Sequence, residues 1–411
     1  MLPNSDTFYG ILMVILEDIK MNVYEESLKM HKEHRGKLEI HTKVPCKTKE
    51  DLSLAYTPGV AEPCREIYKD EENSFIYTNR GNTVAVITDG SAVLGLGNIG
   101  AAAGLPVMEG KCLLFKRFAN IDAFPICLKT QDPKEIISIC KNLEPGLGGI
   151  NLEDISAPRC VEIEETLKRE MNIPVFHDDQ HGTAIVVLAA LINTSRLMKK
   201  KPEDYKIVIS GTGAAGSSII KTLYNYGFRN ILAFDVDGCL NRDDSENYNP
   251  LKKDLLNYVN LNNEKYASLK EGVKGRDVFV GVSAPNLLDV EAVKSMSKES
   301  VIFAMANPVP EISYEDAKKA GAYIIGTGRS DYPNQINNIL AFPGIFRGAL
   351  DAKATKITDK EKIAASEAIA FLIKDEELST DYIIPSPFDE RVAAAVAEAV
   401  KKSCIESGNI R

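Results

Sequence analysis

KIVISGTGAAG, at residues 206–216, is an apolar run that ends in a glycine-rich loop. The loop has the spacing G-x-G-x-x-G, follows a predicted strand and opens a predicted helix over 217–226. Glycines let the backbone turn tightly and approach a pyrophosphate at a helix N-terminus. The next predicted strand ends in Asp235, whose carboxylate can accept hydrogen bonds from a ribose hydroxyl. We therefore predict a dinucleotide site that includes Gly211, Gly213, Ala214, Ala215, Gly216 and Asp235.

The same glycine spacing also occurs earlier in the chain, at residues 95–100. This first loop has no acidic residue at the end of a following strand, and its surroundings are apolar. We expect it to be a structural turn in the first domain, because the motif alone does not define a nucleotide site.

Short apolar strands alternate with helices in the region that begins at residue 206. The predicted strands cover residues 206–210, 230–235, 277–281, 301–305 and 322–326. Continuous apolar strands with intervening helices indicate a doubly wound parallel sheet of the Rossmann type. Earlier in the chain, strand and helix signals are mixed, with a strand at 82–88 and a helix that opens at Pro133. Residues 344–407 are mostly helical in pattern and are expected to pack back on the domains.

The chain of 411 residues is too long for one ordinary core. We predict an α/β protein with an N-terminal mixed α/β domain, a Rossmann-type NAD(P)-binding domain and a helical C-terminal segment. The expected division is an N-terminal extension at 1–20, followed by 21–182, 183–345 and 346–411.

Composition excludes several classes of partner. The chain has 58 acidic and 49 basic residues, a formal charge of −9 and no long basic block, which argues against nucleic acid or an anionic membrane as a partner. The apolar run at 8–16 is shorter than a bilayer span of roughly 20 residues. The eight cysteines form no C-x-x-C pair and are expected to be reduced, as in a cytoplasmic protein.

Two acidic pairs precede the glycine loop, at Glu153-Asp154 and at Asp178-Asp179. Carboxylate oxygens suit a hard cation such as Mg²⁺ or Mn²⁺, whereas a zinc site usually needs thiolate or imidazole. Either pair alone is more often a solvated loop end. However, Asp178 follows a predicted buried strand at 172–176 and precedes an apolar helix at 183–197, so it lies where α/β proteins bind ligands.

Several motifs, taken in order, resemble the malic enzymes in their short, prokaryotic form. They are LAYTPGVA at 54–61, DGSAVLGLG at 89–97, PVMEGK at 106–111, the acidic clusters at 153–179, and Asn337-Asn338 ahead of Phe342-Pro343-Gly344. The resemblance extends from about Met21 to the end of the helical segment. It implies oxidative decarboxylation of L-malate to pyruvate and CO₂ with reduction of NAD or NADP.

The resemblance also assigns roles to individual residues. Tyr56 is similar to the family's general acid, Lys111 to its general base, and Asp178 to the carboxylate that orients this lysine. Lys111 can act as a base only if burial or a nearby cation lowers its pKa. The implied metal ligands are Glu153, Asp154 and Asp179. Asn307 and Asn338 resemble residues that contact the substrate or the nicotinamide, so the implied substrate site consists of Tyr56, Lys111, Asn307 and Asn338.

One position departs from the family pattern, and several alternatives stay open. Longer family members carry an arginine that binds a substrate carboxylate where this chain has Ala92, so another group must bind that charge.

Malolactic chemistry, which turns malate into lactate, and a catalytically silent nucleotide-binding protein are the alternative functions. Asp235 favours NAD over NADP, although Arg242, Lys252 and Lys253 are close enough in sequence to neutralise a 2′-phosphate. The resemblance suggests a homodimer.

Overall fold

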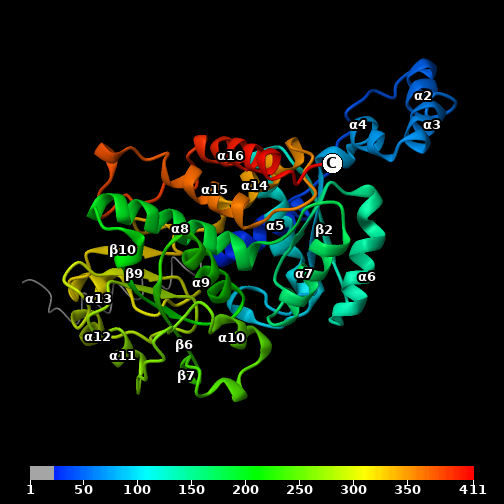
Figure 1. The fold of residues 1–411 in the computed structure, drawn as a ribbon. Coiled ribbons are helices and arrows are strands. Elements are labelled where there is room, and N and C mark those ends of the chain that lie inside the picture. Colours follow the sequence, from blue (N-terminus) through cyan, green and yellow to red (C-terminus); the bar gives the residue numbers. More distant parts are fainter. Residues whose placement is uncertain (1–22) are drawn as a thin grey trace, which may run out of the picture.

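The protein was analysed as a computed structural model that describes residues 23–411. The predicted N-terminal extension at 1–20 lies outside the described residues. Two β-sheets, one from each half of the chain, flank a shared set of helices (Figure 1). The predicted α/β fold class is confirmed.

The first sheet has four parallel strands in the order β2-β1-β3-β4. These are β1 (Thr83–Thr88), β2 (Asp122–Cys127), β3 (Gly149–Leu152) and β4 (Val175–His177). The helices that connect them are α5 (Ala101–Ala119), α6 (Pro133–Leu143) and α7 (Arg159–Glu170). The predicted strand at 82–88 and the helix opening at Pro133 are confirmed, and the Asp132 side chain caps α6 by accepting from the Lys134 backbone N–H.

The second sheet has six strands in the order β10-β9-β8-β5-β6-β7. Five are parallel: β5 (Lys206–Ser210), β6 (Asn230–Asp235), β8 (Val278–Gly281), β9 (Val301–Ala304) and β10 (Ile324–Thr327). The sixth, β7 (Gly238–Cys239), pairs antiparallel with β6. The sequence pattern missed β7 because two residues carry no periodicity. The connecting helices are α9 (Ala214–Tyr226), α10 (Pro250–Leu255), α11 (Leu269–Gly272), α12 (Val290–Lys294) and α13 (Tyr314–Lys319).

Both faces of each sheet are covered, and the two inner faces share one hydrophobic core. In β1, Val84 and Val86 belong to this shared core, whereas Ala85 and Ile87 face a separate core under α6 and α7. This division follows from the alternation of side chains along a strand. The shared core also contains one face of the second sheet, and a third core covers the other face of that sheet.

The long helix α8 (Asp178–Met198) lies in the shared core and links the two sheets. It is long and apolar enough to cross a membrane by composition, but 72% of its most apolar window is buried inside the fold. The predicted start at Thr183 is wrong, since α8 begins at Asp178. Acidic side chains are favourable in the first turn of a helix because they face its positive end.

The proposed domain boundary between residues 182 and 183 falls inside α8, so the division into domains stays a prediction.

The C-terminal helices pack back on the body as predicted. They are α14 (Phe342–Asp351), α15 (Asp359–Ala370) and α16 (Arg391–Ser407), and they pack on one another and on α5 and α8 (Figure 1). The helices α14 and α16 approach closely at two glycines. A Cβ added at Gly344 would lie 2.6 Å from the Val396 Cβ, and one at Gly348 would lie 2.4 Å from the Ala397 carbonyl oxygen.

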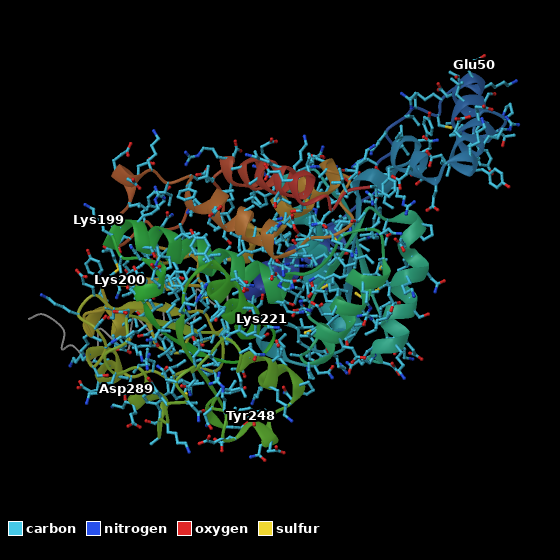
Figure 2. The ribbon with its side chains drawn as sticks, viewed as in Figure 1. Glu50, Lys199, Lys200, Lys221, Tyr248 and Asp289 are labelled. Carbon is cyan, nitrogen blue, oxygen red and sulfur yellow. The ribbon has the colours of Figure 1, made fainter. Side chains whose placement is uncertain are left out.

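A small arm projects from the body. It contains the short helices α2 (Lys49–Ala55), α3 (Ala61–Lys69) and α4 (Ser74–Tyr77), seen at the upper right of Figure 1. The helices α2 and α3 bury none of their residues. Glu50 marks the outer part of this arm in Figure 2.

Replacing Gly348 by alanine should destabilise the protein by about 1–3 kcal/mol, because the added methyl group forces α14 and α16 apart. The expected result is a lower Tm in thermal unfolding followed by circular dichroism. Gly146→Ala is the matched control, since a Cβ at Gly146 meets no atom within 4 Å. Equal Tm values for the two variants would contradict the close packing of α14 on α16.

Candidate active site

The two acidic pairs meet because their strands are neighbours. The strands β3 and β4 run parallel, and Leu152 at the end of β3 is paired with His177 at the end of β4. Glu153-Asp154 and Asp178-Asp179 come directly after these two residues. The acids therefore lie at one carboxyl edge of the sheet, with the second pair already in the first turn of α8.

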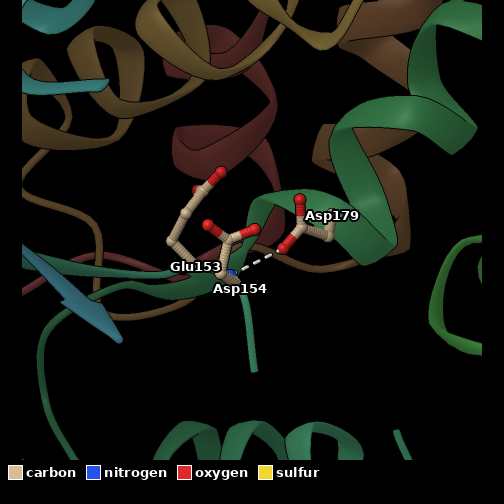
Figure 3. Close-up of side chains that lie close together, drawn as sticks. All are labelled: Glu153, Asp154 and Asp179. Carbon is tan, nitrogen blue, oxygen red and sulfur yellow. Dashed lines mark hydrogen bonds between the residues drawn. The ribbon is translucent and has the colours of Figure 1, made fainter. Parts of the chain in front are cut away.

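Three carboxylates form a compact cluster. One oxygen each from Glu153, Asp154 and Asp179 lies within 4.8 Å of the other two, with Glu153 and Asp154 buried and Asp179 half-buried. The Asp154 backbone N–H donates to the Asp179 Oδ2 at 2.8 Å (Figure 3). Three carboxylates from two neighbouring loops fit a hard divalent cation, which takes oxygen ligands. The donor set thus fits the metal site that the sequence suggested.

Lys111 on α5 reaches this cluster from another part of the chain. Its Nζ donates to the Asp178 Oδ2 at 2.5 Å and lies 2.8 Å from the Glu153 Oε1. The Asn338 Nδ2 donates to the same Asp178 oxygen at 2.5 Å. Lys111 also lies 4.3 Å from the centre of the Phe342 ring. Residues far apart in the chain therefore hold one ammonium group among carboxylates.

The carboxylates around Lys111 change the pKa of its ammonium group. Burial alone would lower the pKa of Lys111, but the carboxylates of Asp178 and Glu153 offset this effect and hold the pKa above its ordinary value. Burial alone therefore does not give Lys111 the lowered pKa that a base requires, and the effect of a nearby cation stays a prediction. Burial raises the pKa of Asp178 to about 6 despite the lowering effect of Lys111. Burial also raises the pKa of Glu153 well above its ordinary value.

Sequence reasoning missed the residues that support this arrangement. Gly182 lies under Asp178, and a Cβ at this glycine would lie 2.0 Å from the Asp178 Oδ1. Asn151, which is fully buried, donates to the Glu153 Oε2 at 2.8 Å. Glu164 on α7 accepts from the His177 backbone N–H at 3.0 Å and lies 2.8 Å from the His181 Nε2, so it fixes the first turn of α8. These contacts join separate segments and have no local sequence signal.

The glycine loop at residues 211–216 has the geometry of a close turn onto a helix. Gly211 has φ +106°, and a Cβ at Gly216 would lie 1.9 Å from the Gly211 carbonyl oxygen, so only glycine fits there. The helix α9 begins at Ala214, three residues before the predicted start at Ser217. Ala214, Ala215 and Gly216 therefore form its first turn, where backbone N–H groups can meet a phosphate.

Asp235 ends β6 beside this loop and is already engaged by other side chains. The Thr212 hydroxyl donates to it, and the Lys252 Nζ lies 2.9 Å from its Oδ2 and 3.0 Å from the Asp237 Oδ2. Arg242 instead donates to the backbone carbonyls of residues 256, 260 and 261. Of the three basic residues that the sequence suggested near a 2′-phosphate, Lys252 is the one with a described contact to Asp235.

The glycine loop at 95–100 forms a turn within the first half of the chain. Its Gly100 donates a backbone hydrogen bond to Gly90, and a Cβ at Gly95 would lie 2.8 Å from the Pro308 Cδ. The loop therefore packs against the segment of Asn307, which belongs to the second half of the chain. This packing agrees with a structural rather than a nucleotide-binding loop.

One cavity of about 1250 Å³ brings the two halves of the site together. Its lining includes Lys111, Glu153, Asp154, Asp179, Ala215, Asn307 and Asn338. Ala92 also lines it. Among the described residues no arginine lines the cavity; the basic side chains in its wall are His31, His34, Lys37 and Lys111. These residues are the available partners for a substrate carboxylate in place of an arginine at position 92.

Tyr56 lies apart from this cavity. It follows α2 in the projecting arm, its side chain is 66% exposed, and it is not among the lining residues. Of the residues implied for catalysis, the structure brings Lys111 and Asp178 together but does not bring Tyr56 to them within one chain.

Comparison with known proteins gives matches along nearly the whole described chain. The sequence model described as "Malic enzyme, N-terminal domain" matches residues 35–168, and "Malic enzyme, NAD binding domain" matches residues 180–405. The chain is 56% identical over 391 residues to the bifunctional malic/malolactic enzyme of Bacillus subtilis, covering 95% of each chain. It is 51% identical over 391 residues to the NAD-dependent malic enzyme of Geobacillus stearothermophilus, covering 95% of this chain and 81% of the relative.

A solved structure of a malic enzyme also matches the fold of this chain. The crystal structure of the NAD-dependent malic enzyme from Thermotoga maritima has a TM-score of 0.88 and 51% sequence identity, covering 91% of this chain and 98% of that chain. Relatives named as NADP-dependent malic enzymes are 44–47% identical.

Asp179→Asn should weaken Mn²⁺ binding by at least tenfold, because it removes one of three charged ligands from the cluster. Isothermal titration with Mn²⁺ measures this directly and needs no turnover. Glu165→Gln, an exposed residue on α7, makes the same change of charge outside the cluster and should bind Mn²⁺ like the parent protein. Unchanged Mn²⁺ affinity in Asp179→Asn would place the cation elsewhere.

Proposed function

The chain belongs to the malic enzyme family, whose members are NAD(P)-dependent enzymes that oxidise and decarboxylate malate, and we propose how its cavity carries out this reaction. The observation that carries the proposal is the position of Lys111. Its ammonium group contacts Asp178 and Glu153 in the same cavity that Ala215 of the nucleotide loop and Asn307 line. A proton acceptor, a cluster of cation ligands and a dinucleotide loop therefore meet at one place.

Two bound groups would supply chemistry that the chain lacks. A divalent cation held by Glu153, Asp154 and Asp179 would polarise the C2 oxygen of malate, and the nicotinamide would accept the hydride from C2. Positive charge at these carboxylates would also offset the stabilisation of the Lys111 ammonium and favour its neutral form.

The residues of the chain would then move the protons. Neutral Lys111 takes the proton of the C2 hydroxyl as the hydride leaves. When the C3–C4 bond then breaks to release CO₂, Lys111 returns this proton to the C2 oxygen, which gives the enol of pyruvate and leaves Lys111 neutral. In the last step Tyr56 donates its hydroxyl proton to C3 while the enol proton passes to Lys111. Lys111 then returns a proton to the Tyr56 oxygen, which restores both groups. Asp178, held by Asn338, keeps the Lys111 Nζ in place throughout.

Malolactic chemistry is a second candidate because of one observation. The relative that is 56% identical is named a bifunctional malic/malolactic enzyme. In that reaction the reduced cofactor stays bound and passes its hydride to pyruvate, which gives lactate. The same cavity serves both reactions, since both begin with oxidation of malate.

One malate reaction distinguishes these outcomes. With Mn²⁺ and either cofactor, we expect pyruvate and free reduced nicotinamide in equal amounts, and no product after chelation of the metal. Separate quantification of pyruvate, lactate and reduced nicotinamide measures this. Lactate without free reduced nicotinamide would establish the malolactic reaction instead, and turnover that persists after chelation would exclude the metal.

We propose that the enzyme favours NAD over NADP. Asp235 and Asp237 place two carboxylates around the single ammonium group of Lys252, so the ribose end of the site has an excess of negative charge. A carboxylate accepts hydrogen bonds from ribose hydroxyls but repels a 2′-phosphate. Lys252 moderates this repulsion and is therefore the residue that permits use of NADP.

Lys252→Ala should increase the preference for NAD, measured as the ratio of kcat/KM for the two cofactors, by about tenfold. This corresponds to a lost charge interaction of roughly 1.4 kcal/mol with the 2′-phosphate. Lys253→Ala is the matched control: it removes the same charge one residue away, where the structure describes no ion pair to Asp235. If both variants change the ratio equally, a general effect of charge explains the preference and Lys252 has no special role.

We further propose that the protein works as a cytoplasmic homodimer. All eight cysteines are free thiols, which suits a reducing compartment. The exposed apolar side chains of the arm support contact with a second copy.

A further inference from the structure

Glu311 is a buried acid that the mechanism above does not use. It follows the segment of Asn307 after β9, and its side chain has no exposed surface. Its hydrogen-bond donors within residues 23–411 are all neutral: the backbone N–H groups of Ser283 and Ala306 and the Ser283 hydroxyl. Burial raises the pKa of Glu311, and the two backbone donors offset part of that effect. Because a buried carboxylate without a cation beside it is costly, its contacts indicate what it holds in place.

The two backbone donors belong to different loops at the carboxyl edge of the second sheet. The strands β8 and β9 are neighbours, and their last residues, Gly281 and Ala304, are paired in register. In the loop after β8, the Ser283 N–H donates to the Glu311 Oε1 at 2.9 Å. In the loop after β9, the Ala306 N–H donates to the Glu311 Oε2 at 3.1 Å. One carboxylate thus joins the two loops, with one oxygen for each.

A glycine at the end of β8 makes room for this carboxylate. A Cβ at Gly281 would lie 2.3 Å from the Glu311 Cδ and 2.6 Å from each of its two oxygens. Any larger residue at position 281 would therefore displace the acid. Close packing and hydrogen bonds together fix the position of the Glu311 carboxylate.

The two loops form part of the wall of the cavity that contains Lys111. Ser283 and Ala306 line this cavity, and so does Asn307, which follows Ala306 directly. Glu311 itself is not a lining residue. Its carboxylate lies behind the wall, one hydrogen bond away from residues that face the cavity.

The loop after β8 also contacts the glycine loop of the predicted dinucleotide site. The hydroxyl oxygens of Ser283 and Ser210 lie 2.9 Å apart, and Ser210 directly precedes Gly211. A Cβ at Gly211 would lie 2.8 Å from the Val282 carbonyl oxygen. The ends of β5, β8 and β9 are therefore connected to one another through Ser283 and Glu311.

From these contacts, and resting on the function proposed above, we infer that Glu311 is a positioning residue for the nicotinamide end of the cofactor site. Its carboxylate holds the loops of Ser283 and Asn307 in a fixed place beside the glycine loop. The cavity wall that receives the nicotinamide then keeps a fixed distance from the carboxylates that hold the cation, as hydride transfer requires. Glu311 acts through these two loops and not by contact with the substrate.

A positioning role and a role limited to stability predict different results. If Glu311 only stabilised the fold, its loss would lower every partial reaction in the same proportion, because fewer molecules would be folded. A positioning residue of the nicotinamide site affects the step that needs the nicotinamide and spares a step that does not. Decarboxylation of oxaloacetate, the keto acid that oxidation of malate gives, uses the cation and Lys111 but transfers no hydride.

Glu311→Gln tests the inference with little change of shape. The amide keeps one acceptor oxygen but turns its NH₂ group towards one of the two backbone donors, so one loop is released. We expect kcat/KM for malate oxidation with Mn²⁺ and NAD to fall about 10- to 100-fold. The rate of Mn²⁺-dependent oxaloacetate decarboxylation should stay within about twofold of the wild-type rate.

Cofactor binding gives a second readout that needs no turnover. In a titration followed by the fluorescence of the reduced nicotinamide ring, the Kd for NADH should be about fivefold higher in Glu311→Gln than in the wild type, since one loop of the wall loses its hydrogen bond. The Mn²⁺ affinity, measured by isothermal titration, should be unchanged.

Matched variants separate the position of the charge from the charge itself. Glu299→Gln makes the same change at an exposed residue just before β9 and should leave both reactions unchanged. Gly281→Ala keeps Glu311 but places a Cβ where its carboxylate lies, and it should lower malate oxidation more than oxaloacetate decarboxylation. Gly146→Ala, whose Cβ meets no atom within 4 Å, controls for the added methyl group.

Three results for Glu311→Gln would each overturn the inference: an equal loss of malate oxidation and oxaloacetate decarboxylation, loss of the folded circular dichroism spectrum, or an unchanged Kd for NADH. A wild-type protein whose NADH affinity depends on Glu311 but which oxidises no malate would instead refute the proposed function and leave the positioning role standing.

Discussion

Buried negative charge at the edge of the first sheet is the constraint on which the rest of the site depends. Four carboxylates, those of Glu153, Asp154, Asp178 and Asp179, meet there with the single ammonium group of Lys111. Buried charges are costly unless they are paired, and one lysine neutralises only part of this set. Burial is the main cause of the raised pKa values of Glu153 and Asp178, and neighbouring carboxylates add to it. The proposed divalent cation would supply positive charge at this place, so the crowding of carboxylates favours its binding.

The fold positions this charge with few elements. The register between β3 and β4 aligns the two acidic pairs, and α8 starts at the second pair and continues into the core shared by both sheets. The helix α5 brings Lys111 to these carboxylates. Because α8 also packs on α9, which opens at the nucleotide loop, packed helices connect the clustered carboxylates to that loop. Hydride transfer requires this fixed distance between substrate and cofactor.

The features that the sequence predicted well are those encoded by residues adjacent in the chain. Strands from 206 to 327, the glycine loop and the two acidic pairs each have a local pattern, and all lie where that pattern indicates. Helix starts were less accurate, since the apolar periodicity of α8 begins at Thr183 whereas its backbone becomes helical at Asp178. The supporting contacts of Gly182, Asn151, Glu164 and Lys252 were not predictable, because each depends on a partner brought close only by the folded chain. The ion pairs that hold the pKa of Lys111 above its ordinary value are equally non-local.

Tyr56 shows a further limit, because a motif identifies a residue but not the place that the fold gives it. The run around Tyr56 matches the family pattern, yet its side chain is 66% exposed on the arm and does not line the cavity. One chain therefore keeps Lys111, its carboxylates and the nucleotide loop at one cavity but leaves Tyr56 outside it. The proposed binding of cation and cofactor and the proposed protonation of C3 thus depend on different parts of the molecule. A change in the arm is expected to act on the last step of the reaction and to leave the cluster of carboxylates intact.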